Sequence, residues 1–261
     1  MITSVHNPKV QAVRKLLVQS KARREQEEFV IEGVRLAEEA LHAGWEARLV
    51  LFTDKLDERG QGVLNGFTIR SVPVEQVSEA VMHAISRTET PQGILAVLAI
   101  KPKPLPQSPH FLLILDSIRD PGNIGTILRT AAAAGVQAVL LTPGCADAWS
   151  PKVVRAGMGA HFRLPILNFG WLELKHTLAQ TGSSFHVFLA DSAAGIPYTQ
   201  ADFRPPLALI IGGEAAGAGS ESLSMAEGIV HIPMPGGSES LNAAAAASIL
   251  LFEVQRQRSQ G

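Results

Sequence analysis

The sequence predicts an α/β protein of two domains, and three observations lead to this expectation. A chain of 261 residues, 46% hydrophobic and 18% charged, is long enough for one large or two modest globular domains. Four prolines crowd into the stretch 101–109, where they favour an extended linker. After it, apolar candidate strands alternate with helical stretches, as in a parallel sheet covered on both faces. We therefore expect domains at 1–100 and 110–261, joined by the linker 101–109.

The first domain is expected to be a small alternating α/β fold. Short runs rich in β-branched, aromatic and leucine residues predict its strands. These runs lie at 28–32, 48–53, 67–72 and 93–99. Apolar residues at helical spacing predict helices between them, near 34–43 and 75–86.

The second domain is expected to hold longer strands that are apolar along their whole length. They lie at 111–116, 138–142, 185–190, 207–212 and 228–234. A helix from Asn123 to Ala134 follows Pro121-Gly122 and ends at Gly135. The last helix, about 242–257, opens with five consecutive alanines, which favour helix and allow close backbone approach.

Charge is distributed unevenly along a chain whose formal net charge is −1. Residues 1–35 carry seven Lys and Arg against four Glu, whereas residues 36–100 carry five basic and nine acidic side chains. A local basic stretch suits a phosphate-bearing partner that is touched at one edge. A solvated helix face is the alternative, and both interpretations stay open.

Several classes of protein are disfavoured by composition. No run of about 18 apolar residues is present, so we expect no membrane span, and no secretory signal is visible at the N-terminus. The single Cys145 excludes an internal disulfide and a multi-cysteine zinc site. Since the histidines show no i, i+4 pairing, we expect no metal. The expected location is the cytoplasm.

Three segments of the second domain are candidates for a ligand site: 116–129, 212–219 and 232–242. Each follows or ends a predicted strand, at the carboxyl edge where open α/β sheets bind ligands. Standard nucleotide motifs fail on spacing. Two residues after Gly212 comes Glu214, where the dinucleotide fingerprint needs glycine, and no lysine completes a P-loop. A dinucleotide-dependent enzyme is therefore disfavoured.

These segments read D-x-x-x-D-P-x-N-x-G-x-I-x-R-T-A, G-x-E-x-x-G and I-P-M-x-G-x-x-x-S-L-N-x-x-x-A. Together they resemble the three motifs of the SpoU/TrmH branch of the SPOUT RNA methyltransferases, over roughly 110–258. The closest likeness is to the RNA 2′-O-ribose methyltransferases that carry an N-terminal substrate-binding domain. The stretch from His6 to Leu41 also resembles that leading domain, a small fold similar to kink-turn-binding ribosomal proteins.

The resemblance implies a SPOUT-type parallel sheet with a deep trefoil knot, a chain threading that general topological rules would not suggest. It also implies S-adenosylmethionine as the methyl donor, held mainly by backbone groups. The residues at the corresponding motif positions are Thr142, Gly212, Gly213, Ile232, Met234 and Leu241. Gly212 and Gly213 suit such recognition because no Cβ obstructs the ligand.

Arg129 occupies the family's catalytic position. The resemblance implies that it activates the ribose hydroxyl, either as a base or by fixing the adjacent phosphate and stabilising a developing alkoxide. The electrostatic role does not require deprotonation of the guanidinium, which stays charged in proteins. Both roles stay open. The other implied site residues are Asn123, Glu214, Ser240 and Asn242. For Asn123, Ser240 and Asn242, helix capping is the structural alternative.

The sequence thus predicts an S-adenosylmethionine-dependent RNA 2′-O-methyltransferase with ribosomal RNA as its expected substrate. A tRNA substrate, or a catalytically silent RNA-binding module of the same fold, is the alternative. We also expect a homodimer built by the second domain. The final helix is apolar nearly all round, so its own sheet covers one face and a second subunit covers the rest.

Overall fold

A computed structural model describes residues 1–181, 185–192, 194–212 and 219–260. The chain forms two compact units. The first consists of Met1–Lys101 together with Trp149–Phe162, and the second of Pro102–Ala148 together with Arg163–Gly261. The predicted division into 1–100, 101–109 and 110–261 stays a prediction. The structure differs from it in that Trp149–Phe162 belongs to the first unit.

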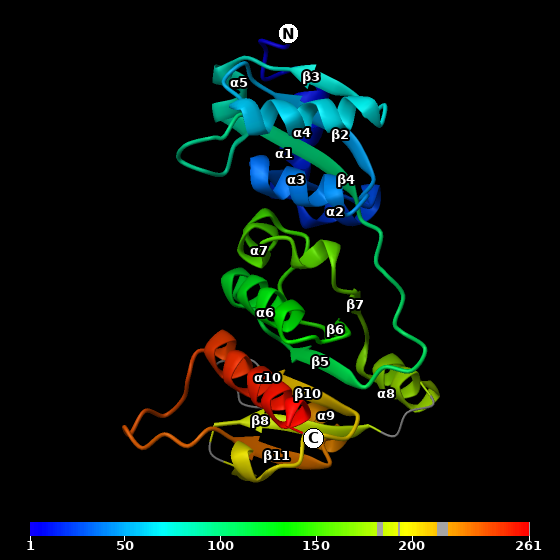
Figure 1. Cartoon of the computed structure of the whole chain (residues 1–261), viewed down its shortest axis with the longest axis vertical. Helices are drawn as coiled ribbons and strands as arrows, with labels where there is room; N and C mark the ends of the chain where they lie inside the picture. Colours follow the sequence, from blue (N-terminus) through cyan, green and yellow to red (C-terminus); the bar gives the residue numbers. More distant parts are fainter. Residues whose placement is uncertain (182–184, 193, 213–218, 261) are drawn as a thin grey trace. The chain divides into compact units, whose positions relative to one another are not determined.

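The first unit is built on a mixed sheet (Figure 1). Its strands run in the order β1-β4-β2-β3, with β3 parallel to β2 and the other pairs antiparallel. The strands are β1 (Glu28–Glu32), β2 (Ala47–Phe52), β3 (Val74–Gln76) and β4 (Ile94–Ala99). The helices are α1 (Pro8–Val18), α2 (Ser20–Gln26), α3 (Val34–His42), α4 (Glu58–Ile69) and α5 (Glu79–Ile85).

Helices cover both faces of this sheet. Val13 of α1 and Met82 of α5 share a buried apolar cluster with Val30 of β1. Side chains alternate across a strand, so the neighbouring Phe29 and Ile31 point to the opposite face. Helices α3 and α4 pack against the sheet and against each other. The alternation of strands and helices confirms the predicted α/β class.

The strand predicted at 67–72 is wrong. Residues up to Ile69 belong to α4, whose N-cap Asp57 accepts a hydrogen bond from the Gly60 amide at 2.7 Å. Val63 and Phe67 are buried one helical turn apart. The β-branched run was misleading because it spans the end of this helix and a turn before β3.

The segment Trp149–Phe162 completes the first unit. It contains α7 (Pro151–Gly157) and a short 3₁₀ helix (Ala160–Phe162), and α7 packs against β1. The Trp149 ring lies 4.8 Å from that of Phe29, and Trp45 packs edge-on against Phe162 at 5.3 Å. Pairs of this kind each add about 1 kcal/mol beyond burial. These apolar contacts explain why the segment folds with residues far earlier in the chain.

The second unit contains a parallel sheet, seven-stranded in the described part of the chain, in the order β7-β6-β5-β10-β8-β11-β9. Its strands are β5 (Phe111–Asp116), β6 (Ala138–Leu141), β7 (Ile166–Asn168), β8 (His186–Asp191), β9 (Ile196–Pro197), β10 (Leu207–Gly212) and β11 (Gly228–His231). Its helices are α6 (Pro121–Ala133), α8 (Trp171–Gln180), α9 (Ser220–Met225) and α10 (Ala243–Ser259), and a 3₁₀ turn spans Tyr198–Gln200. The predicted parallel sheet is confirmed.

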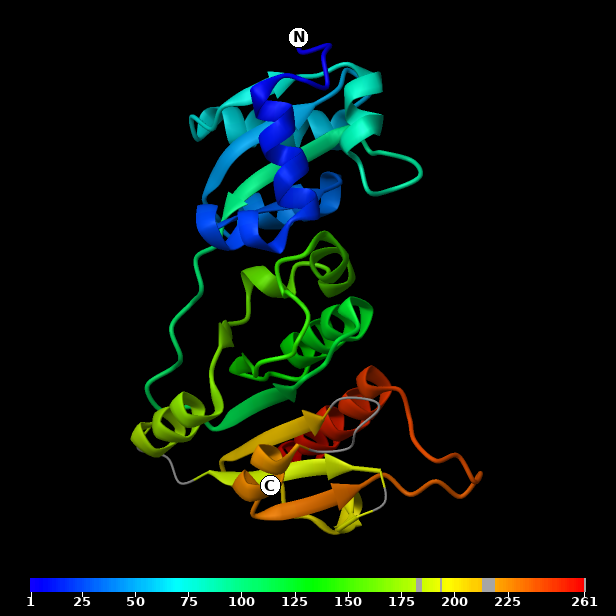
Figure 2. The same ribbon diagram turned by 180° about the vertical axis from the view of Figure 1, so that it is seen from behind.

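This sheet is the middle layer of its unit (Figure 2). Helix α8 covers one face, where Leu174 and Leu178 share an apolar cluster with Leu112 and Ile114 of β5. Helices α6 and α10 pack against each other, and α10 also packs against β10. Because β5 and β10 are buried along nearly their whole length, they read as continuous apolar runs in the sequence.

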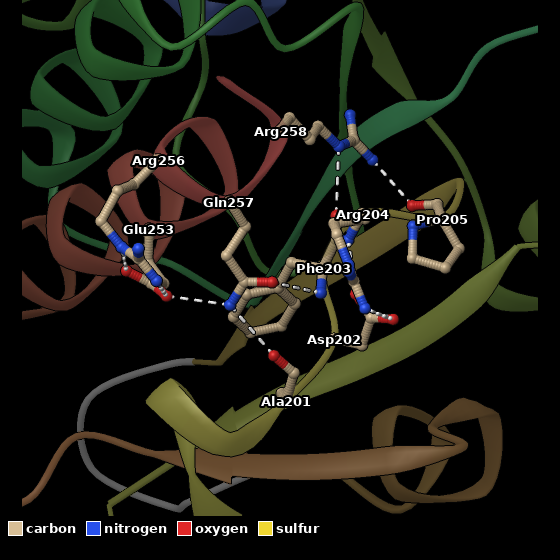
Figure 3. Close-up of polar contacts among 9 residues, drawn as sticks. All are labelled: Ala201, Asp202, Phe203, Arg204, Pro205, Glu253, Arg256, Gln257 and Arg258. Atoms are coloured by element: carbon tan, nitrogen blue, oxygen red, sulfur yellow. Dashed lines mark hydrogen bonds and ion pairs between the residues drawn. The ribbon is translucent and has the colours of Figure 1, made fainter. Parts of the chain in front are cut away.

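The C-terminal end of α10 is fastened to the loop before β10 (Figure 3). Gln257 accepts a hydrogen bond from the Phe203 amide at 2.8 Å and donates to the Ala201 carbonyl at 3.0 Å. Arg258 donates to the carbonyls of Phe203 and Pro205 at 3.1 and 2.8 Å. Burial lowers the pKa of this guanidinium. These contacts fix the C-terminal end of α10 relative to the loop before β10.

Candidate active site

The predicted site segments meet at one edge of the second sheet. Strands β5, β6, β8, β10 and β11 are parallel, so their carboxyl ends lie on the same side. Asp116 at the end of β5 is directly opposite Gly212 at the end of β10. The edge therefore brings together the first residues of the segments 116–129 and 212–219. The end of β11, from which the segment 232–242 continues, lies at the same edge.

Asp116 is the polar centre of this edge. Its side chain is buried, and its carboxylate accepts hydrogen bonds from Ser117 Oγ at 3.0 Å and Thr142 Oγ1 at 3.2 Å. Ser222 Oγ of α9 donates to the second oxygen at 2.5 Å. These bonds connect the ends of β5 and β6 with the helix that follows the glycine-rich segment.

Helix α6 carries two of the predicted catalytic residues on different sides. Asp120 caps the helix by accepting a hydrogen bond from the Asn123 amide at 2.8 Å. Asn123 is buried, whereas Arg129 lies on the exposed side with Thr126 and Ala133. Among the described residues, Arg129 has no hydrogen-bond or ion-pair partner, so its guanidinium is free to meet a ligand.

Asn242 links the third segment to the first. Its Nδ2 donates to Asn123 Oδ1 at 2.9 Å, and its Oδ1 caps α10 by accepting from the amides of Ala244 and Ala245. The structure thus brings together Asn123 and Asn242, which lie 119 positions apart in the sequence. The hydrogen bond between the two asparagines connects α6 with the start of α10. The cap that Asn242 forms on α10 agrees with the capping alternative for this residue.

The other predicted residues differ in how far they are buried. Thr142 is buried beside Asp116, and Ile232 and Met234 are half-buried in the segment after β11. Ser240 and Leu241 are exposed just before α10. Gly213 and Glu214 lie outside the described residues, so their predicted roles stay predictions. Sequence reasoning did not select Asp116 as a site residue, although it opens the first motif. It missed Ser222 because an isolated serine on a short helix carries no motif signal.

Cys145 is packed into the same region as a structural side chain. Its Sγ donates a hydrogen bond to the Leu115 carbonyl at 3.1 Å, and burial raises the pKa of the thiol. A raised pKa keeps the thiol protonated and poorly nucleophilic at neutral pH. Cys145 is therefore an inert packing residue of the second unit.

The described residues offer neither a metal-binding cluster nor a membrane-spanning helix. They contain no group of three or more His, Cys, Asp or Glu side chains arranged to hold a metal ion. Within them, no helix is both long and apolar enough to cross a membrane.

The chain is a two-unit α/β protein whose candidate active site lies at the carboxyl edge of a parallel sheet. Residues 110–252 match the SpoU rRNA Methylase family, and residues 7–96 match the MRM3-like substrate binding domain. The chain belongs to the SpoU rRNA methylase family. The resemblance drawn from the three motifs is confirmed.

Relatives match over most of their length. The chain is 36% identical to the human mitochondrial rRNA methyltransferase 3, over 90% of this chain and 69% of the relative. It is 35% identical to a 23S rRNA guanosine 2′-O-methyltransferase of Bacillus subtilis, over 97% of this chain and 98% of the relative. A crystal structure of an AdoMet-bound rRNA methyltransferase from Sinorhizobium meliloti superposes with a TM-score of 0.87 at 33% identity, over 98% and 97%. The AdoMet complex of the SpoU methyltransferase AviRb from Streptomyces viridochromogenes gives 0.87 at 28%, over 98% and 100%.

Proposed function

We propose that the protein transfers a methyl group from S-adenosylmethionine to a ribose 2′-hydroxyl of ribosomal RNA. The observation that carries this proposal is the meeting of the three motif segments at one sheet edge, with Arg129 exposed beside them. Relatives that act on ribosomal RNA and neighbours that bind AdoMet support the reaction and the donor.

The residues present fit the donor. Gly212 ends β10 without a Cβ, so a ligand can approach its backbone closely. The proposed binding site for the donor, called the donor cradle below, consists of Gly212 and the other motif residues. These are Thr142, Gly213, Ile232, Met234 and Leu241. S-adenosylmethionine, when bound, supplies an electrophilic methyl group on a sulfonium. The task left to the chain is to orient the hydroxyl and to stabilise negative charge on its oxygen.

Arg129 performs that task in the proposed mechanism. Its guanidinium contacts the phosphate next to the target ribose and lowers the energy of the developing alkoxide. Asn123 and Asn242 hold α6 against α10 and so fix the position from which Arg129 reaches the RNA. Glu214 and Ser240 remain site residues that the family resemblance implies.

Nucleoside analysis tests the proposed function. The purified protein is incubated with methyl-labelled S-adenosylmethionine and transcripts of ribosomal RNA or tRNA, and the digested RNA is analysed by mass spectrometry. We expect a 2′-O-methylnucleoside in ribosomal RNA. Methylation of tRNA alone would identify tRNA, and not ribosomal RNA, as the substrate. Binding of RNA without binding of the donor would indicate a catalytically silent RNA-binding module.

The first unit is proposed to bind the RNA through helices α1 and α2. Among the described residues, Arg14, Lys15 and Arg24 are exposed there without an ion-pair partner. Lys21, in contrast, pairs with Glu25 at 3.7 Å. The structure therefore narrows the basic stretch to a few available cations.

Replacing Arg14 and Lys15 together by alanine is expected to weaken RNA binding about tenfold at low salt. Each lost phosphate contact also reduces the slope of log K against log salt concentration by roughly 0.7–0.9. Fluorescence anisotropy at several salt concentrations measures both quantities. Lys21→Ala is the matched control, because that charge is already paired. An unchanged slope in the double variant would place the RNA elsewhere.

We also propose a homodimer through α10. The exposed stripe of this helix contains Ile249 and Phe252, which are 36% and 52% exposed. Leu250 of the same helix, in contrast, is 1% exposed and belongs to the core of its own chain. Phe252 is therefore the residue that tests the interface.

Phe252→Asp is expected to shift the protein from dimer to monomer at micromolar concentration. In a twofold contact the substitution removes an aromatic group from both subunits, which costs about 1.5–3 kcal/mol for each buried ring. Sedimentation equilibrium distinguishes the dimer from the monomer, because the monomer has the 27.8 kDa mass of one chain. Leu172→Asp, on an 85% exposed side chain of α8, is the control. A wild-type monomer would contradict the proposal.

The trefoil knot and the cytoplasmic location remain proposals of the same family assignment. The bacterial relative named above acts on 23S rRNA, whereas the human one is mitochondrial. Location is tested by fractionation of the source cells.

A further inference from the structure

Asp116 is a buried carboxylate surrounded by neutral donors. The side chain is 5% exposed, and each hydrogen-bond donor that it has among the described residues is a hydroxyl group. Ser222, which makes the shortest of these bonds, is fully buried. No Lys, Arg or His of the described residues forms an ion pair with Asp116.

The hydrogen bonds of Asp116 compensate its burial but place no cation beside its charge. Transfer of an ionised carboxylate into the interior is costly unless a cation or several hydrogen bonds compensate it. The hydroxyl groups provide hydrogen bonds without neutralising the charge. The negative charge of the carboxylate therefore creates a negative potential at the sheet edge, which a cationic ligand can use.

The position of Asp116 directs that potential at the donor cradle. It is paired in register with Gly212 on the adjacent strand, and neighbouring strands lie about 4.8 Å apart. It also accepts a hydrogen bond from Thr142. Gly212 and Thr142 are both proposed donor contacts, so a ligand seated against them lies close to the carboxylate.

We infer that Asp116 makes the cradle prefer the cationic methyl donor over its neutral-sulfur product. This inference rests on the proposed function. S-adenosylmethionine carries a sulfonium charge that disappears when the methyl group leaves, whereas the rest of the molecule keeps its charges in S-adenosylhomocysteine. A fixed negative charge beside the cradle attracts S-adenosylmethionine more than S-adenosylhomocysteine. It therefore favours binding of the donor and release of the product.

Calorimetric titration of Asp116→Asn tests the inference by binding alone. The ligands are S-adenosylmethionine, S-adenosylhomocysteine and sinefungin, in which a carbon bearing a protonated amine replaces the sulfonium. In the variant, affinity for the two cationic ligands is expected to fall, and the ratio of product to donor Kd to fall roughly tenfold. An unchanged ratio would overturn the inference.

Ser222→Ala is the matched control. It removes the 2.5 Å hydrogen bond to Asp116 and keeps the charge, so both affinities change together and the ratio stays within about twofold. Asp116→Glu, which retains the charge, is expected to recover part of the preference. A ratio that falls equally in Ser222→Ala would assign the effect to packing and overturn the role of charge.

The wild-type protein provides a measurement that needs no folded variant. It must bind sinefungin more tightly than S-adenosylhomocysteine, and equal affinities would contradict the inference. Failure of the wild type to bind S-adenosylmethionine at all would instead contradict the proposed function. The two failures are therefore distinguishable.

Discussion

Arg129→Ala is expected to lower the rate of methyl transfer by at least a hundredfold and to leave donor affinity within about twofold. Removal of one group that stabilises a developing oxyanion typically costs a factor of 10²–10³. The side chain is exposed on α6 and has no hydrogen-bond or ion-pair partner in the described part of the chain, so its loss disturbs no internal contact. Single-turnover transfer and calorimetry with the donor measure the two quantities separately.

Two further variants make this result interpretable. Arg129→Lys keeps the charge but loses the planar fork that binds phosphate through two hydrogen bonds, so we expect an intermediate rate. Arg204→Ala is the control, because Arg204 is an exposed arginine paired with Asp202 at 2.7 Å before β10 begins. Arg129→Ala with more than about a tenth of the wild-type rate, a barrier difference under about 1.4 kcal/mol, would contradict the assignment.

The strands of the second unit could be predicted because burial on both faces leaves a simple signal. The predicted ranges 111–116 and 207–212 coincide with β5 and β10, and both strands contain almost only apolar residues. The placement of the site at the carboxyl edge followed from the parallel sheet, and Asp116 and Gly212 are indeed opposite each other.

The first unit was harder to predict because its helices mix glycine with β-branched residues. Gly66 of α4 faces Leu41 of α3 so closely that a Cβ would collide with it, so tertiary packing selects a residue that weakens the helical signal. The same limit applies to the site. The bond between Asp116 and Ser222 spans 106 positions, and no local pattern encodes such a pair.

Trp149 shows the largest gap between sequence and structure. Its position between two strands of the second sheet gave no reason to expect contact with Phe29. In the structure it is 7% exposed, and its ring lies 4.8 Å from Phe29 and 5.2 Å from His161. The core of the first unit therefore includes a segment that the chain supplies only after β6 is complete.

Trp149→Ala is accordingly expected to destabilise the first unit by about 3–5 kcal/mol, the usual cost of removing a buried tryptophan. Donor affinity should stay within about twofold, because the proposed donor contacts belong to the second unit. Urea unfolding followed by near-UV circular dichroism, with calorimetry for the donor, checks both expectations. Trp171→Ala is the comparison, since Trp171 starts α8 and packs against the apolar cluster of the second sheet. A cost below about 1 kcal/mol for Trp149→Ala would show that Trp149–Phe162 is not an integral part of the first unit. A matching loss of donor binding would show that the two units do not unfold separately.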